Sequence, residues 1–262
     1  MKYAQSAVLF LLAMCLFFSP KNAAAGVTDS IEPSVVFLTQ ENGAGGKGIN
    51  FGTGFLVSRG DRPYLVTASH VAKDLGPDFK MVMSGDGGRA VMDRMQGIKW
   101  NISPSADVAF TELARGDQEK TGRLLRRSMP ARLMTARSLP PSRDISLVAM
   151  GFPLGLGSRG HVSPLSFETR AASGFITLER FDNKKEATFI LLQSPSISGL
   201  SGGPVFDVGR PLVEGSRLEP RDGLSLVGLV SGVIWDKTGG KLAMIVPATE
   251  IARLFESNSP RT

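Results

Sequence analysis

Short apolar stretches separated by turn residues recur along most of this sequence. Each stretch is four to six residues long and is bounded by glycine, proline or charged residues. Segments of this length and spacing are typical of β-strands, and many short strands with few helices indicate a β-barrel or a β-sandwich. The segments that we predict as strands are 35–38, 54–58, 64–68, 80–83, a stretch near Ile98, 108–112, 145–150, 174–177, 188–193, 226–230 and 241–246.

One helix is expected after the last predicted strand. Pro247 has the fixed φ angle that suits the first turn of a helix. Apolar side chains then follow at helical spacing, at Ile251, Leu254 and Phe255. This spacing predicts a short helix over about 247–257.

The polar and basic segment 116–139 is interpreted as a connector between two halves of the chain, with some helix in it. The first half would cover about 31–125 and the second about 140–246. Two other segments, the glycine-rich 42–49 and the insertion 208–223, are predicted to be exposed connections. Regulatory or partner-binding loops are the alternative interpretation of both.

Residues 1–25 have the pattern of an export signal. Lys2 gives a positive start, an apolar run covers 7–18, and alanines at 23–25 supply the small residues that a signal peptidase requires. The alternative is a membrane anchor, but a bilayer-spanning helix needs about twenty apolar residues. We therefore predict a mature chain of 26–262, periplasmic or secreted, without stable membrane insertion after cleavage.

Charge and cysteine content narrow the functional classes. The formal net charge of +6 falls to +4 once the two lysines of the signal are removed. Basic and aromatic residues do not interleave, so nucleic-acid binding is not expected, and Arg123, Arg126 and Arg127 are interpreted as a solvated face. The single cysteine, Cys15, leaves with the signal. The mature chain therefore has no disulfide and no thiol nucleophile, and we expect neither metal nor cofactor.

Three segments carry residues suited to acyl-transfer chemistry. His70 ends the segment TASH at 67–70, Asp107 opens an apolar run, and Ser201 lies in GLSGGP at 199–204. Serine needs a base to take its proton, and the base needs a carboxylate to hold its tautomer. The order histidine, aspartate, serine is that of the chymotrypsin-type double β-barrel. We therefore predict Ser201 as nucleophile, His70 as base and Asp107 as the orienting carboxylate.

The glycines around Ser201 allow a sharp turn and a close approach of a substrate carbonyl. The backbone N–H groups of Gly199 and Ser201 are predicted to form the oxyanion hole. Structural alternatives exist for the three residues: a plain glycine-serine turn, a core histidine at His70 and a strand-start aspartate at Asp107.

The other histidine and the nearest other aspartate have less suitable surroundings. His161 lies in a glycine-rich stretch and is interpreted as an exposed loop residue. Asp93 is the nearest rival to Asp107, but it is interpreted as a surface pair with Arg94.

These motifs resemble those of a trypsin-like serine peptidase of the bacterial, disulfide-free type, closest to the protease domain of the HtrA (DegP-like) group and without its PDZ module. The resemblance covers nearly the whole predicted mature chain. It implies an all-β fold of two six-stranded antiparallel β-barrels, with His70 and Asp107 in the first barrel, Ser201 in the second, a cleft between them and a short C-terminal helix. The matching segments are 52–55, 65–70, 107–109, 149–153, 199–204 and 246–247.

The resemblance also implies how a substrate binds. Ser231-Gly232-Val233 match the strand that pairs with the substrate backbone, and Ser231 would also hydrogen-bond the aspartate. The pocket floor would lie at Pro195, where no acid is present to pair with lysine or arginine, and Val230 stands where glutamate-specific members carry histidine. A neutral pocket lined by Pro195, Ser196 and Val233 is expected, which favours a small or medium apolar residue before the scissile bond.

Two departures from the family pattern concern activation. Leu200 stands where digestive-type members carry an aspartate, and the expected N-terminus Gly26-Val27-Thr28-Asp29 is not the Ile-Val-Gly-Gly pattern. Activation by insertion of a new N-terminus is therefore not expected, and what orders the oxyanion loop stays open.

The sequence thus predicts an exported serine endopeptidase that acts on proteins or peptides through an acyl-enzyme. The alternative is a catalytically latent binding or scaffold protein on the same fold, because a collapsed oxyanion loop would leave the three residues idle. An esterase is a third option, since the same chemistry cleaves esters. The natural substrate and the oligomeric state are left open.

Overall fold

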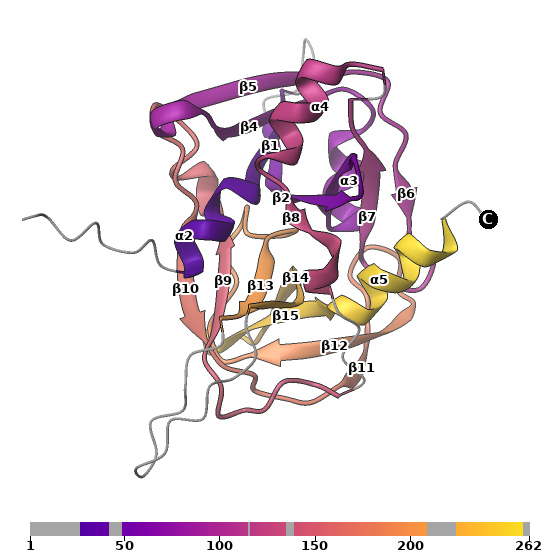
Figure 1. Ribbon diagram of the computed structural model, residues 1–262. Helices are drawn as coiled ribbons and strands as arrows, with labels where there is room; N and C mark the ends of the chain where they lie inside the picture. The colour runs from indigo at the N-terminus through magenta and orange to yellow at the C-terminus, as the bar shows by residue number, and fades with distance from the viewer. Residues whose placement is uncertain (1–26, 42–48, 115, 135–138, 209–223, 259–262) are drawn as a thin grey trace, which may run out of the picture.

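The two halves of the chain build two separate β-sheets in the computed structural model (Figure 1). The export signal predicted at 1–25 lies outside the described residues, as do the predicted loops 42–49 and 208–223 except at Ile49 and Val208. The structure describes residues 27–41, 49–114, 116–134, 139–208 and 224–258.

The first sheet contains eight strands among the described residues. They are β1 (Val35–Glu41), β2 (Ile49–Arg59), β3 (Arg62–Thr67), β4 (Phe79–Ser84), β5 (Ala90–Met95), β6 (Asn101–Ile102), β7 (Ala109–Glu112) and β8 (Met129–Pro130). Their spatial order is β5-β4-β1-β2-β3-β7-β6, and β8 pairs in parallel with β2. The other pairs of this sheet are antiparallel.

The second sheet contains seven strands, all paired antiparallel, in the order β10-β9-β13-β14-β15-β12-β11. A bridge between Ala171 and Leu192 and a hydrogen bond of 3.0 Å from Gln193 N to Arg170 O join the end of β10 to the end of β12. This contact closes the sheet on itself. The strands are β9 (Leu147–Gly151), β10 (Leu165–Thr169), β11 (Ile176–Glu179), β12 (Glu186–Leu192), β13 (Pro204–Asp207), β14 (Ser225–Trp235) and β15 (Lys241–Pro247).

This architecture confirms the predicted all-β fold of two antiparallel halves. The family pattern implied six strands in each half, and the short strands β6, β8 and β11 raise the observed numbers in the described residues. The strand expected near Ile98 was misplaced, because the chain pairs only at β6. β5 and β10 were missed, since both alternate exposed and half-buried positions and so lack an apolar run.

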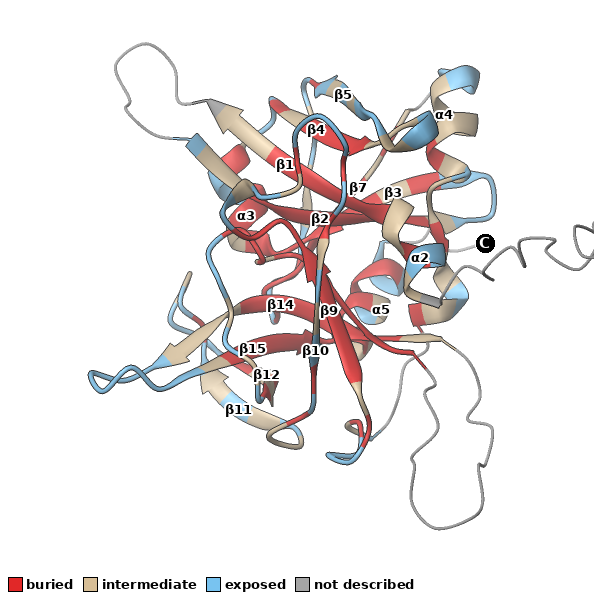
Figure 2. Cartoon of the chain, turned by 90° about the vertical axis from the view of Figure 1, so that its left-hand side faces the viewer, coloured by how far each residue is buried: buried red, intermediate tan, exposed pale blue. Residues whose placement is uncertain are grey.

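Strand β9 explains how the two halves pack together. Leu147 and Ala149 belong to a core inside the second sheet, whereas Val148 and Met150 belong to the larger core that extends into the first half. Because successive side chains of a strand point to opposite faces, β9 is buried on both faces (Figure 2). This accounts for its nearly continuous apolar sequence.

Helices are short and few among the described residues. The connector contains the predicted helical turn, α4, and Asp117 caps it by accepting a hydrogen bond of 2.9 Å from Lys120 N. Helix α3, which follows β3, was not predicted. The helices are α2 (Val27–Ile31), α3 (Ser69–Leu75), α4 (Gln118–Leu125) and α5 (Ala248–Ser257), with 3-10 turns at Glu32–Ser34, Asp86–Gly88, Ala131–Met134 and Pro153–Gly155.

The last helix ties the second sheet to the first. Helix α5 follows β15, with Pro247 as its N-cap, and confirms the helix predicted over 247–257. Its Phe255 stacks on Phe110 with ring centroids 4.2 Å apart and meets Tyr64 edge-on at 5.2 Å. Both partners belong to the first sheet, so α5 crosses back over the inter-sheet boundary (Figure 1).

The basic face predicted on the connector is only partly solvated. Arg126 is exposed, but Arg123 donates to both carboxylate oxygens of Asp93 at 2.8 Å. Arg127 donates to the carbonyl of Ser84 at 2.6 Å. These contacts tie α4 to the first sheet. They also correct the expected Asp93–Arg94 pair and remove Asp93 as a rival to Asp107.

Candidate functional site

Strand pairing brings His70 and Asp107 together. Thr67 at the end of β3 pairs with Ala109 at the start of β7, in antiparallel orientation. His70 closely follows β3, as the second residue of α3, and Asp107 closely precedes β7. Antiparallel neighbours place the end of one strand beside the start of the next, so both residues lie at the same end of the sheet.

Asp107 is only 3% exposed and accepts four hydrogen bonds. Its Oδ2 accepts from His70 Nδ1 at 2.8 Å and from Ser231 Oγ at 2.6 Å. Its Oδ1 accepts from Ser69 Oγ at 2.6 Å and from His70 N at 3.0 Å. An ionised carboxylate can only accept, so Nδ1 of His70 carries a proton and Nε2 is left as the basic nitrogen of the neutral ring.

The pKa values of the pair move apart. Burial raises the pKa of Asp107, but hydrogen bonds and charge from His70, with smaller contributions from Ser231 and Ser69, outweigh it and hold that pKa well below 3.8. Burial lowers the pKa of His70, but the hydrogen bond and charge of Asp107, aided by Asp74 and Asp182, raise it above 6.5. The pair is thus polarised as an ionised carboxylate beside a strengthened base.

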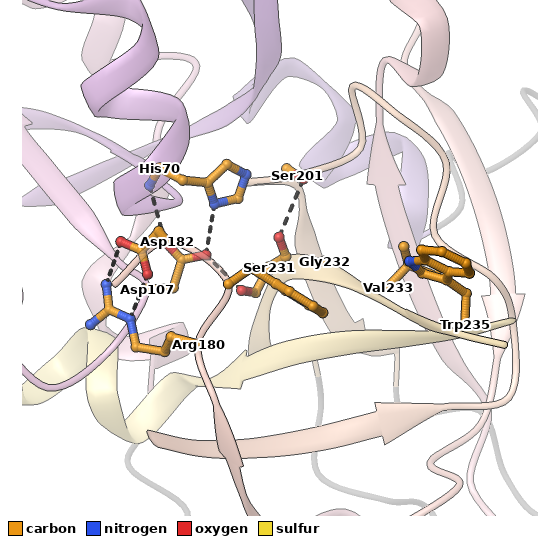
Figure 3. A pocket seen from close by; sticks show the side chains of 10 residues that line it. His70, Asp107, Arg180, Asp182, Ser201, Ser231, Gly232, Val233 and Trp235 are labelled. Atoms are coloured by element: carbon orange, nitrogen blue, oxygen red, sulfur yellow. Dashed lines mark hydrogen bonds and ion pairs between the residues drawn. The ribbon is translucent and has the colours of Figure 1, made fainter. Parts of the chain in front are cut away.

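The second sheet brings Ser201 to the same cleft. Ser201 lies in the turn before β13, and Gly202 N donates to Val230 O of β14 at 2.7 Å. This pairing puts Ser201 beside Ser231, and its Oγ donates to the carbonyl of Ser231 at 3.4 Å. Figure 3 shows Ser201 on the side of the His70 ring away from Asp107. The three predicted residues therefore meet, although the serine hydroxyl bonds to Ser231 rather than to His70.

The peptide groups next to Ser201 have a defined orientation. The carbonyl of Ser198 accepts a hydrogen bond from Leu154 N at 2.7 Å, and the carbonyl of Leu200 is engaged within the turn at 2.9 Å. In a trans peptide the C=O and the following N–H point in opposite directions. The N–H groups of Gly199 and Ser201 are therefore turned away from these contacts, and neither has an acceptor among the described residues.

Thr53 of β2 orders this loop from the other sheet. Its hydroxyl donates to Gly199 O at 2.7 Å and accepts from Phe152 N at 3.0 Å. Its backbone N–H donates to Ser201 O at 2.9 Å. Leu200 is 3% exposed and packs in the core of the second sheet. The hydrogen bonds of Thr53, here called the threonine clamp, and the buried Leu200 thus order the loop around Ser201. The sequence analysis had left open what orders this loop.

Gly202 allows the turn to approach the first sheet closely. Its φ is +84°, a region that side chains disfavour. An added Cβ would lie 2.0 Å from Thr53 O and 2.2 Å from Thr67 Oγ1. The position therefore requires glycine for both conformation and space.

A cavity of about 410 Å³ opens beside these residues. Ser231, Gly232 and Val233 line it, and their pairing with a substrate backbone stays a prediction. Pro195 and Ser196 lie outside it, Pro195 being exposed, so their assignment to a substrate pocket stays a prediction. The lining residues are His70, Asp107, Arg180, Phe181, Asp182, Ser201, Ser231, Gly232, Val233 and Trp235.

Four lining residues escaped the sequence analysis: Arg180, Phe181, Asp182 and Trp235. The first three form the turn between β11 and β12, and Trp235 ends β14. The only sequence signal was a pair of opposite charges flanking an aromatic residue between two predicted strands. Such a pair indicates a turn, and it does not indicate which part of the other half it contacts.

Other titratable residues do not add a second center. His161 is exposed, as predicted, and forms a β-bridge with Arg89. Within the described ranges, no group of three or more His, Cys, Asp or Glu side chains is arranged to hold a metal ion. In the same part of the chain, no helix has the length and apolar character needed to span a membrane.

Comparisons with known proteins agree with this arrangement. Solved structures of Rv3671c from M. tuberculosis are similar: an inactive serine-to-alanine mutant (TM-score 0.57, 17% identity, covering 93% of this chain and 96% of that chain) and the active form of the protease (0.57, 18%, 91% and 86%). At such identities the similarity supports the fold. No curated protein sequence matches significantly. A family model for the trypsin-like peptidase domain matches residues 52–213. Since this match spans more than half of the sequence, the chain belongs to the trypsin-like peptidase family.

Proposed function

We propose that this chain is an exported serine endopeptidase with Ser201 as nucleophile, His70 as general base and Asp107 as the carboxylate that orients the base. The observation that carries the proposal is the buried His70–Asp107 pair, 2.8 Å between Nδ1 and Oδ2, facing a serine in a tight glycine turn. The membership in the trypsin-like peptidase family supports proteins or peptides as substrates.

The proposed reaction proceeds in two halves. Ser201 Oγ bonds to the carbonyl carbon while His70 Nε2 takes its proton, and the C–N bond then breaks as His70 gives that proton to the leaving amine. Water next attacks the acyl ester, His70 takes a proton from it, and the ester bond breaks as the proton returns to Ser201 Oγ. Asp107 stays ionised throughout and stabilises the imidazolium.

Ser201 must turn toward His70 for the first step. Its present hydrogen bond to the Ser231 carbonyl, at 3.4 Å, is long and therefore weak. Catalytic hydrogen bonds are often long or misaligned without substrate and tighten when it binds. A rotation about the Ser201 side chain is thus a small change compared with rebuilding the loop.

The oxyanion is proposed to bind at the N–H groups of Gly199 and Ser201. Their orientation, opposite to two engaged carbonyls, leaves them as donors without an acceptor in the described part of the chain. The substrate backbone is proposed to pair with Ser231–Val233 of β14. β13 pairs with β14 only as far as Leu229, so among the described residues this stretch has no strand on that edge.

The latent scaffold remains a second candidate on one observation: the Ser201 hydroxyl bonds to Ser231 and not to His70. A fluorophosphonate probe separates the two, because it reacts only with a serine that has a working base and oxyanion hole. We expect the wild type to be labelled, and Ser201→Ala and His70→Ala to lose labelling. Ser257→Ala and His161→Ala are the matched controls and should label like the wild type. A folded wild type that resists the probe would support the scaffold.

Removal of the threonine clamp should weaken the oxyanion hole. In Thr53→Val the Gly199 carbonyl and the Phe152 N–H lose their hydroxyl partner at nearly constant volume. Loss of an oxyanion donor typically costs about 10²–10³ in kcat, so we expect a fall approaching about 10²-fold with little change in KM. Thr53→Ser keeps the hydroxyl and is the control. Equal kcat for the Val and Ser variants, measured on one peptide, would contradict the role of the clamp.

Activity should be lost under acidic conditions. His70 accepts the proton of Ser201 only when neutral, and its pKa is raised above 6.5. As the pH falls through that raised pKa, kcat/KM should therefore fall with an apparent pKa above 6.5, whereas Asp107 stays ionised across the range. Titration of the His70 ring by NMR should give the same midpoint. If kcat/KM fell with an apparent pKa below 6.5, Asp107 would not strengthen His70 as a base.

Export is proposed on the sequence pattern of residues 1–25. When the full chain is expressed in a bacterial host, intact mass should show an N-terminus at Gly26 for protein recovered outside the cytoplasm. A double variant, Leu11→Arg with Leu12→Arg, interrupts the apolar run and should keep the full-length chain in the cytoplasm. An uncleaved N-terminus on exported wild type would contradict a cleavable signal.

A further inference from the structure

Arg180 is the largest fully buried side chain among the described residues, with 1% of its surface exposed. It begins the turn between β11 and β12, in the second half of the chain. A buried guanidinium is destabilising unless its hydrogen bonds are satisfied. Its Nη1 has no partner among the described residues. The other two nitrogens therefore determine what this residue does.

Those two nitrogens bind one neighbouring carboxylate and one residue of the first half. Arg180 Nε and Nη2 donate to the two oxygens of Asp182, each at 2.9 Å, in a bidentate pair. Arg180 Nη2 also donates to Ser69 Oγ at 3.0 Å. Ser69 opens α3 and directly precedes His70. Figure 3 shows Arg180 on the opposite side of His70 from Ser201.

The hydrogen bonds of Ser69 have a direction. Its hydroxyl has one hydrogen, and two carboxylates lie within reach: Asp107 Oδ1 at 2.6 Å and Asp182 Oδ2 at 3.3 Å. Arg180 satisfies Asp182 with two strong bonds and fills a lone pair of Ser69 Oγ. The hydrogen of Ser69 is then committed to the shorter contact with Asp107.

A second contact fastens the same turn to α3. Asp182 Oδ2 accepts from Lys73 Nζ at 2.7 Å, one helical turn after Ser69. Ser69 and Lys73 are four residues apart and so lie on one face of the helix. Burial raises the pKa of Asp182, but hydrogen bonds from Arg180 and Lys73 outweigh it and keep that pKa below 3.8. The ionised turn thus contacts α3 on either side of His70 in sequence.

We propose that Arg180 is a positioning residue for the proposed reaction: it holds the β11–β12 turn of the second sheet on Ser69 and so fixes Asp107, and through it the His70 ring, in front of Ser201. Arg180 contacts no reacting atom in this scheme. Its effect passes through the Ser69 hydroxyl, and this inference rests on the function proposed above.

A double-mutant cycle tests whether Arg180 acts through Ser69. Arg180→Met should lower kcat about 10²-fold with little change in KM, the scale expected when a reacting group is misplaced by about 1 Å. Ser69→Ala should lower kcat at least as much, because it removes the hydroxyl through which Arg180 acts. The double variant should be no worse than Ser69→Ala alone, because the two residues form one path. Lys184→Met, on the same turn but with a side chain 70% exposed, is the control and should keep wild-type kcat.

An NMR measurement that needs no catalytic turnover tests the positioning role separately from the proposed function. The His70 Nδ1–H proton, followed by NMR, should give a sharp downfield signal in the wild type and in Lys184→Met. The signal should be broadened or lost in both Arg180→Met and Ser69→Ala. If the wild type shows this signal without turnover, the proposed function fails and the positioning role still stands.

Three results would overturn the positioning role. One is an Arg180→Met protein with wild-type kcat and an unchanged Nδ1–H signal. Another is a cycle in which the two losses multiply, because Arg180 would then act independently of Ser69. If Arg180→Met does not fold, the Ser69→Ala variant decides: unchanged kcat together with an unchanged signal would remove the path that the proposal needs.

Discussion

The buried carboxylate of Asp107 is the constraint on which the rest of this site depends. A charge at 3% exposure is tolerated only when hydrogen bonds replace its water. Its donors come from both halves of the chain: His70 and Ser69 from α3, and Ser231 from β14. Removing one partner of a buried ion pair typically costs about 3–5 kcal/mol. The site is therefore complete only when the two sheets are docked.

The turn that carries Ser201 depends on the same docking. Thr53 in the first sheet holds two carbonyls of this turn, and Gly202 leaves no space between the turn and β2. The chain can form no internal disulfide to hold these parts, because Cys15 is its one cysteine. Core burial on both faces of β9 and the return of α5 to the first sheet supply the rigidity instead. Placement of the nucleophile thus follows from packing between the halves.

Local patterns in the sequence were enough to find the residues that meet in the cleft. His70 ends one apolar run, Asp107 opens another and Ser201 lies in a glycine turn, and antiparallel pairing brings such ends together. Apolar spacing likewise predicted an all-β chain with a terminal helix, whereas the division into two barrels came from the family resemblance. Their predicted roles in catalysis remain proposals, and so does the assignment of Pro195, which was placed by counting from the nucleophile.

What the sequence could not provide was contact between its halves. Arg180 and Asp182 escaped the sequence analysis because a charged pair between two predicted strands is usually solvated. Only the packing of the β11–β12 turn against α3 buries Arg180 and half-buries Asp182. Thr53 is one hydroxyl in an apolar strand, and its role exists only where Gly199 and Phe152 approach it. Each of these residues acts across the boundary, which no periodicity within one half can reveal.

A latent and an active protein would differ in one of two rearrangements: collapse of the oxyanion loop, or rotation of the Ser201 side chain. A collapsed oxyanion loop would require the Ser198 carbonyl to leave Leu154 N and the Gly199 carbonyl to leave the Thr53 hydroxyl, two hydrogen bonds of 2.7 Å, of which the second is buried. Leaving the buried Gly199 carbonyl unpaired would cost about 1–3 kcal/mol. Turning Ser201 from the Ser231 carbonyl to His70 breaks one bond of 3.4 Å and forms another. The loop that must be ordered for catalysis is therefore held by several hydrogen bonds, whereas the hydroxyl that must move is held by one long hydrogen bond.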